Sequence, residues 1–163
     1  MRDGVLDRVR DFLLGLAAPD DEQPDEAERL RIARTALMFR VIDADGKVLD
    51  EESEALRDTL ARTYGLDGDG VDELVRLGQR ADHGATDLYE HTSLIRRVTD
   101  MEERERLVEV LFELAYADEE LHEGEDATVK RISDLLGVDP RARVLARKNV
   151  ADRHGLSAIA KGG

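Results

Sequence analysis

The chain of 163 residues has no cysteine and no tryptophan, and only 4% of its residues are aromatic. Without cysteine it has no disulfide, no catalytic thiol and no cysteine-based zinc site. Its core must come mainly from leucine, valine, isoleucine and alanine. With only three prolines, this composition favours packed helices over sheets. The length predicts a single domain.

Long apolar runs are also missing, since none approaches the roughly 20 residues that a membrane-spanning helix needs. A short apolar patch at residues 12–18 follows Asp3, Asp7 and Asp11. A signal peptide has basic residues at those positions, so we reject one here. We therefore expect a cytoplasmic protein.

Acidic residues outnumber basic ones and give a formal net charge of −14. Nucleic acid is excluded as a partner because phosphate contacts need clustered Lys and Arg. Residues 140–163 hold six basic residues and one acidic residue, a net charge of +5, so the rest of the chain carries −19. An acidic body with a basic end indicates cation binding, intramolecular docking of that end, or a basic partner.

Apolar periodicity predicts helices and no strand, hence an all-α compact bundle of seven to eight helices. We expect an amphipathic helix and linker over residues 1–24, a helical domain over 25–153 and a flexible tail over 154–163. Asp50 is a plausible N-cap, and Thr99 with Glu102 forms a plausible capping box. The helices are predicted at about residues 3–18, 26–43, 51–64, 71–82, 86–97, 99–117, 123–136 and 140–153.

Two parts of the chain superimpose without a gap when the sequence is shifted so that Asp45 falls on Asp118. Each part is an apolar helix, then Ala-Asp, an aliphatic residue three positions later, a Glu and the next helix. The same shift, here called the repeat shift, places Glu52 on Glu125. This pattern predicts two pseudo-repeated helix–turn–helix hairpins within the bundle.

The four repeated carboxylates, Asp45, Glu52, Asp118 and Glu125, make a candidate metal site. If the hairpins pack head to head, the carboxylates converge and repel one another unless a proton or a hard cation neutralises them. Oxygen-only ligands favour calcium, magnesium or manganese. The simpler interpretation is structural, because a Glu in the first turn stabilises a helix and an Asp in a turn accepts backbone hydrogen bonds.

The stretch "VIDADGKVLDEES" at residues 41–53 also approximates an EF-hand calcium loop. Asp43, Asp45 and Glu52 fall at ligand positions three, five and twelve, with Gly46 at the turn position. Val41, however, stands where the first ligand belongs, in phase with the apolar face of the preceding helix. We therefore do not interpret this stretch as an EF-hand.

The segments "FRVIDADGKVLDEESEALRDTLARTYGLD" and "LVEVLFELAYADEELHEGEDATVKRISDLLGV" lie within a region, about residues 30–148, that resembles the tellurite-resistance TerB family. The superfamily includes the N-terminal domain of DjlA-type co-chaperones, but the chain has no His-Pro-Asp triplet, so J-domain activity is not implied. The resemblance implies a compact helical bundle with a divalent-cation site. By motif position that site is Asp45, Glu52, Asp118 and Glu125. Glu119 departs from the family, which usually has Gly there.

The leading hypothesis is a non-enzymatic, TerB-like stress-response domain, a divalent-cation-linked regulatory or interaction module. It would act through an unknown protein partner, and a membrane-associated protein is among the candidates. The alternative is a metal-independent scaffold that binds a partner protein or a membrane surface. A metal-dependent hydrolase is not favoured, because neither a complementary base nor a small-molecule substrate site is evident.

Overall fold

The computed structural model describes residues 25–156 except positions 45, 47, 83 and 122, and leaves the side chains of 84–87 aside. Within these residues there are seven helices and no strand, which confirms the all-α prediction. The predicted helix at 3–18 and most of the predicted tail lie outside them. The helices are α2 (Glu26–Ile42), α3 (Asp50–Tyr64), α4 (Gly68–Ala81), α5 (Gly84–Val98), α6 (Met101–Ala115), α7 (Glu123–Leu135) and α8 (Pro140–Arg153).

The chain divides into two compact units, residues 1–31 and residues 32–163. In the shorter unit the described residues open helix α2, where the Asp25 side chain accepts a hydrogen bond from the N–H of Glu28 at 2.8 Å. The larger unit contains the rest of α2 and all the other helices.

Two three-helix segments follow the same plan, and α5 connects them along the chain. The repeat shift places the end of α2, Ile42, on the end of α6, Ala115, and it also places the start of α3 on the start of α7. α4 and α8 match at both ends when the shift is shortened by a single position. The repeat predicted from the two hairpins therefore extends to a third helix in each copy.

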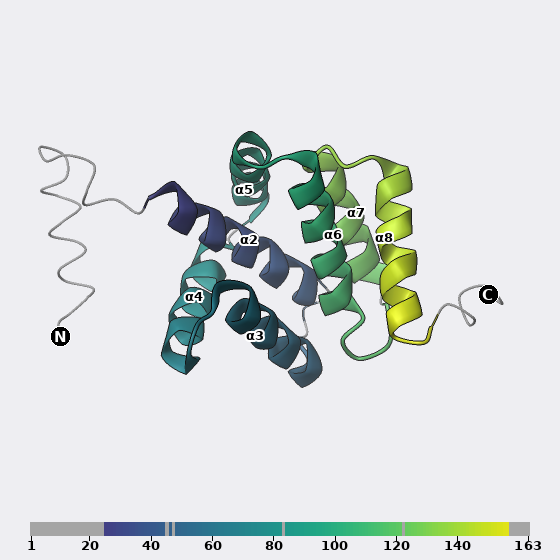
Figure 1. Ribbon diagram of the computed structural model, residues 1–163, viewed down its shortest axis with the longest axis horizontal. Coiled ribbons are helices and arrows are strands. Elements are labelled where there is room, and N and C mark those ends of the chain that lie inside the picture. The colour runs from purple at the N-terminus through teal and green to yellow at the C-terminus, as the bar shows by residue number, and fades with distance from the viewer. Residues whose placement is uncertain (1–24, 45, 47, 83, 122, 157–163) are drawn as a thin grey trace, which may run out of the picture. The chain divides into compact units, whose positions relative to one another are not determined.

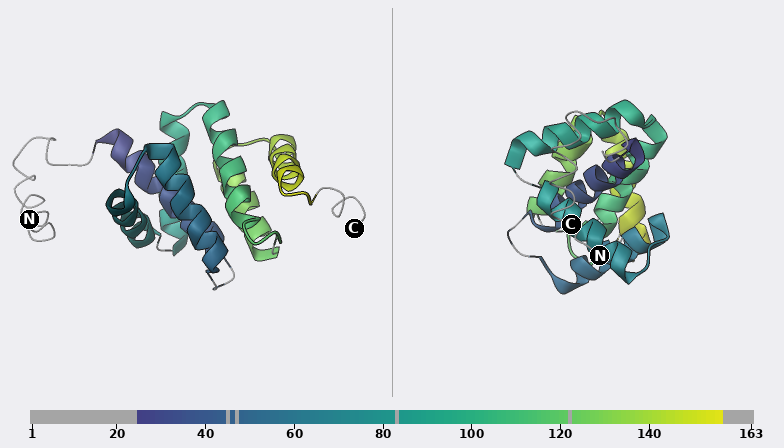
Figure 2. Two further views of the ribbon diagram at one scale, coloured as in Figure 1. Left: turned by 60° about the horizontal axis from the view of Figure 1, so that its bottom comes forward. Right: turned by 90° about the vertical axis from the view of Figure 1, so that its left-hand side faces the viewer.

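The packing of the larger unit centres on α6, which contacts α3, α7 and α8 (Figures 1 and 2). α7 also packs against α8 and α5, and α3 packs against α4. The fully buried apolar side chains of α6 include Val108, Leu111 and Phe112. Since burying such side chains is worth about 1.5–3 kcal/mol each, this apolar face stabilises the bundle.

α2 and α4 approach closely at one glycine. A Cβ atom added to Gly78 would lie 2.4 Å from Cγ2 of Thr35. Both residues are buried, and Thr35 is fully so. A side chain at position 78 would therefore force the two helices apart, which explains a glycine in the interior of a helix.

Two helix starts differ from the prediction. The capping box pairs Asp100 with Glu103, not Thr99 with Glu102, through backbone-to-carboxylate bonds of 2.8 and 3.0 Å. Asp50 lies inside the first turn of α3, whose N-cap is Leu49. In the part of the chain that the structure describes, no helix is long and apolar enough to cross a membrane.

Candidate functional site

The two hairpins turn through the same backbone conformation. Gly46 has φ of 80°, and Glu119, its counterpart under the repeat shift, has φ of 66°, the sole positive φ of a described non-glycine residue. The N–H of Gly46 donates to the carbonyl of Asp43 at 3.0 Å, and the N–H of Glu119 donates to that of Tyr116 at 2.7 Å. The sequence repeat is thus a repeat of geometry, and Glu119 adopts the conformation of the glycine it replaces.

Of the two candidate ligands in the first hairpin, Glu52 is the one that the structure describes. It lies in the first turn of α3 and is 1% exposed. Its Oε1 accepts a hydrogen bond from the N–H of Leu49 at 3.1 Å. Its Oε2 is buried and has no hydrogen-bond partner among the described residues. A buried carboxylate oxygen without a partner is costly, and a cation or an ordered water is the usual remedy.

Glu125 occupies the matching position in the second hairpin. It lies in the first turn of α7 and is also 1% exposed. Glutamate is rarely buried unless it is paired. The helix-dipole interpretation accounts for an acidic residue at a helix start, but a solvent-exposed carboxylate would serve that purpose equally well. The helix dipole by itself therefore does not account for the burial of the two residues.

The candidate site also includes two aspartates. Asp118 is half-buried in the second turn, and its Oδ1 accepts a hydrogen bond from the N–H of Glu120 at 3.1 Å, as the structural interpretation expects. Asp45 lies outside the described residues. Among those described, no three His, Asp or Glu side chains are arranged to hold a metal ion. Glu52, Asp118 and Glu125 therefore do not make a three-ligand site by themselves, and the four-carboxylate site stays a prediction.

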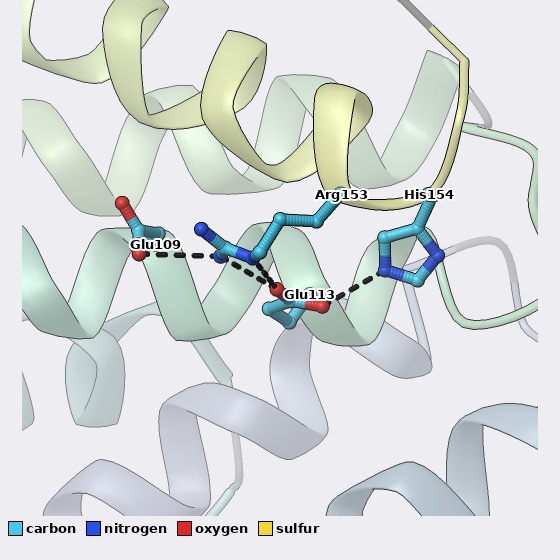
Figure 3. Close-up of polar contacts among 4 residues, drawn as sticks. All are labelled: Glu109, Glu113, Arg153 and His154. Atoms are coloured by element: carbon cyan, nitrogen blue, oxygen red, sulfur yellow. Dashed lines mark hydrogen bonds and ion pairs between the residues drawn. The ribbon is translucent and has the colours of Figure 1, made fainter.

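A cluster of charged side chains joins the end of α8 to α6 (Figure 3). Arg153 donates from Nε to Glu113 at 2.8 Å and from Nη2 to Glu109 at 3.2 Å. His154 Nε2 lies 2.8 Å from the other oxygen of Glu113, and its ring centroid lies 6.1 Å from that of Tyr116. These contacts connect the last turn of α6 to the C-cap of α8.

The charges of this cluster change two pKa values. Burial by itself raises the pKa of Glu113, but the hydrogen bonds and charges of His154 and Arg153 outweigh it, so that the pKa is lowered. The pKa of Arg153 is raised, chiefly by its hydrogen bond to Glu113. Both shifts favour the charged forms of the pair.

The cluster also accounts for part of the basic end of the chain. Arg147 lies 3.5 Å from Asp126, and Arg153 bridges two glutamates. Intramolecular docking, one of the three explanations of the basic end, is confirmed for these two residues. Glu109 and Glu113 were not predicted from the sequence, although their spacing of four residues places them on one face of a helix.

A family of known proteins matches the region that contains both hairpins. The family model described as tellurite resistance protein TerB matches residues 31–148, well over half of the chain. Searches of curated proteins and of solved structures found no significant match. The matched region begins in α2, includes both hairpins and their buried glutamates, and ends within α8. The chain therefore belongs to the tellurite-resistance TerB family.

Proposed function

We propose that this TerB domain is a non-enzymatic regulatory or interaction module linked to a divalent cation. The carboxylates of Asp45, Glu52, Asp118 and Glu125 would hold the ion. The observation that carries the proposal is the buried Oε2 of Glu52, which has no hydrogen-bond partner among the described residues. The burial of Glu125 at the matching position supports it.

The donor set determines which ions suit such a site. All four side chains offer oxygen, which calcium, magnesium and manganese prefer over softer nitrogen and sulfur ligands. The two glutamates belong to α3 and α7, so an ion bound to both would connect the two repeats. Cation binding would then stabilise the folded state and alter how the hairpins are presented to a partner.

The experiment is a titration of the purified, chelator-treated protein with calcium, magnesium and manganese, followed by calorimetry and thermal unfolding. We expect measurable heat with one ion, and a stabilisation of about 2.7 kcal/mol at one hundred times its Kd. Glu52→Gln keeps an oxygen for the Leu49 N–H and should abolish the effect. Glu90→Gln, an exposed change on α5, is the matched control and should titrate like the wild type.

A metal-independent scaffold is the second candidate function, one that binds a partner protein or a membrane surface. The observation that favours it is that the described residues contain no three-ligand group. The same titration separates the two functions. If neither heat nor stabilisation appears with millimolar ion, and Glu52→Gln unfolds at the wild-type temperature with and without ion, the cation proposal is refuted.

A further inference from the structure

A groove runs between α3 and the C-terminal half of α6. Its larger part has a volume of about 580 Å³, within the range of ligand sites in proteins. A second part of about 340 Å³ shares Thr59, Thr63 and Val110 with the first and continues toward α2. The groove is thus elongated along α3, a shape that suits an extended or helical segment better than a compact ligand.

One wall of the groove carries three acidic residues of α3 and ends at the basic Arg62. Glu51, Glu54 and Asp58, here called the acidic wall, lie on a single stripe of α3 and are all exposed. From the first to the last they cover about 10.5 Å of helix. Within the described part of the chain none of the three makes an ion pair, whereas Asp72 on α4 is paired with Arg57.

The floor of the groove is apolar and formed by small or medium side chains. Ala55 of α3, Val110 and Leu114 of α6, and Ala117 of the following turn line it. Leu114 is fully buried, and the other three are half-buried. An apolar floor beside a row of carboxylates matches one face of a helix that carries Lys or Arg next to alanine or leucine.

The acidic wall has no counterpart in the second repeat. The repeat shift places Gly124, Ala127 and Arg131 of α7 at the three positions of the acidic wall. The second repeat folds into the same hairpin with no acidic residue at these positions. Glu54 and Asp58 lie four residues apart on α3 and repel each other, a cost in stability that a cationic partner would remove.

We propose that the groove binds a basic amphipathic helix of a partner protein, with its Lys or Arg side chains along the acidic wall and its apolar side on the floor. This proposal names a partner for the interaction role proposed above, but it does not depend on a bound cation. Its test is therefore carried out in a chelator, so that a failure here and a failure of the cation titration are distinguishable.

The probe is a fluorescein-labelled helical peptide of about 18 residues, with Lys at i, i+3 and i+7 and alanine and leucine on the adjoining face. A peptide of the same composition in scrambled order is the control. We expect the full-length protein to bind the first peptide at least tenfold more tightly, by fluorescence anisotropy. The affinity should fall as salt rises, because exposed charges are screened.

The variants test the location of the peptide. Glu54→Lys/Asp58→Lys should weaken binding at least tenfold. Glu90→Lys/Asp134→Lys changes two exposed acids on α5 and α7, raises the net charge by the same amount and should bind like the wild type. The milder Glu54→Gln/Asp58→Asn should weaken binding by less, and circular dichroism confirms that each variant is folded.

Several results would overturn the proposal. Equal binding of the scrambled peptide, or equal weakening by both lysine variants, indicates attraction to net charge without a site. Tighter binding after removal of residues 157–163 indicates that the chain's own tail occupies the groove. A wild-type dimer in sedimentation that becomes monomeric with Glu54→Lys/Asp58→Lys indicates a second copy as the occupant.

Discussion

The two repeats of this domain form the same hairpin turn with different residues. Where the first hairpin turns at Gly46 with φ of 80°, the second turns at Glu119 with φ of 66°, and equivalent backbone hydrogen bonds close both turns. Glu52 and Glu125 are buried to the same extent. Backbone geometry and the buried glutamate are therefore the constant features of the hairpin, whereas the turn glycine is not.

A polar contact between the first and third helices also recurs in both repeats, with the acidic residue on opposite sides of the contact. In the first repeat Arg40 of α2 donates to Asp82, the C-cap of α4, at 2.7 Å. At the matching positions of the second repeat, Glu113 of α6 binds His154, the C-cap of α8, at 2.8 Å. The fold places a polar pair between the first and third helices of each repeat. The first helix contributes a basic residue in one repeat and an acidic residue in the other.

The largest expected effect of a substitution is at the contact between the first and third helices of the first repeat. Gly78→Ala should lower the free energy of unfolding by about 1–3 kcal/mol, because the added methyl group overlaps Thr35. Gly68→Ala is the matched control in the same helix, with nothing within 4 Å of the added Cβ. It should be neutral or slightly stabilising. Urea denaturation measures both, and equal effects would contradict the close approach of α2 and α4.

Substitutions in the two turns should change the free energy of unfolding in opposite directions. Glu119→Gly should raise the free energy of unfolding by about 1 kcal/mol, because a left-handed conformation is costly for a residue with a Cβ atom. Gly46→Ala should lower the free energy of unfolding by a similar amount, because a residue with a Cβ atom is strained at φ of 80°. No further cost is expected, since no other atom lies within 4 Å of the added Cβ. Chemical denaturation tests the pair. If Glu119→Gly is destabilising, the carboxylate at this position has a role beyond the turn.

The smallest expected effect concerns the cluster at the end of α8. Arg153→Ala should cost about 0.5–1 kcal/mol at pH 7, a low value because both partners are partly exposed and screened by solvent. Arg106→Ala, which removes a more exposed pair with Glu102, should cost less.

The same cluster predicts a pH dependence. The folded pKa of Glu113 is lowered below its ordinary value of 4.5, so its contribution is complete above about pH 4.5 and is lost as the pH falls through the lowered value. The cost of Arg153→Ala should therefore shrink at pH 3, which denaturation at the two pH values measures. A cost that is the same at both would show that Arg153 acts through packing alone.

Much of the fold could be predicted because helices are encoded locally. The period of apolar residues placed the described helices within a few residues of their observed ends, and the repeat shift revealed the hairpins. The exact first residue of each helix was harder to predict. The capping box lies at Asp100 because its side chain and that of Glu103 can bond each other's backbone N–H, while Thr99 bonds the carbonyl of Ile95 instead. Neighbouring residues of similar chemistry compete for such positions, and sequence does not rank them.

The candidate site was predictable only in part. The repeated acids identified Glu52 and Glu125, but nothing in the local sequence distinguishes these buried glutamates from Glu51 and Glu54, which are exposed on the same helix as Glu52. The groove was missed because it lies between α3 and α6, which are far apart in the chain. The spacing of Glu51, Glu54 and Asp58 was visible in the sequence, but the same spacing is typical of any solvent-exposed helix face.

Composition and apolar periodicity specify the helical class, the repeat and the excess of negative charge, because they express local preferences. The packing of the helices sets which glutamates lose contact with water, which basic residues dock on neighbouring helices and which acids lie along an open groove. Burial and ion pairing depend on segments far apart in the chain. The same residue type at neighbouring positions therefore acquires different chemistry only after the helices have packed.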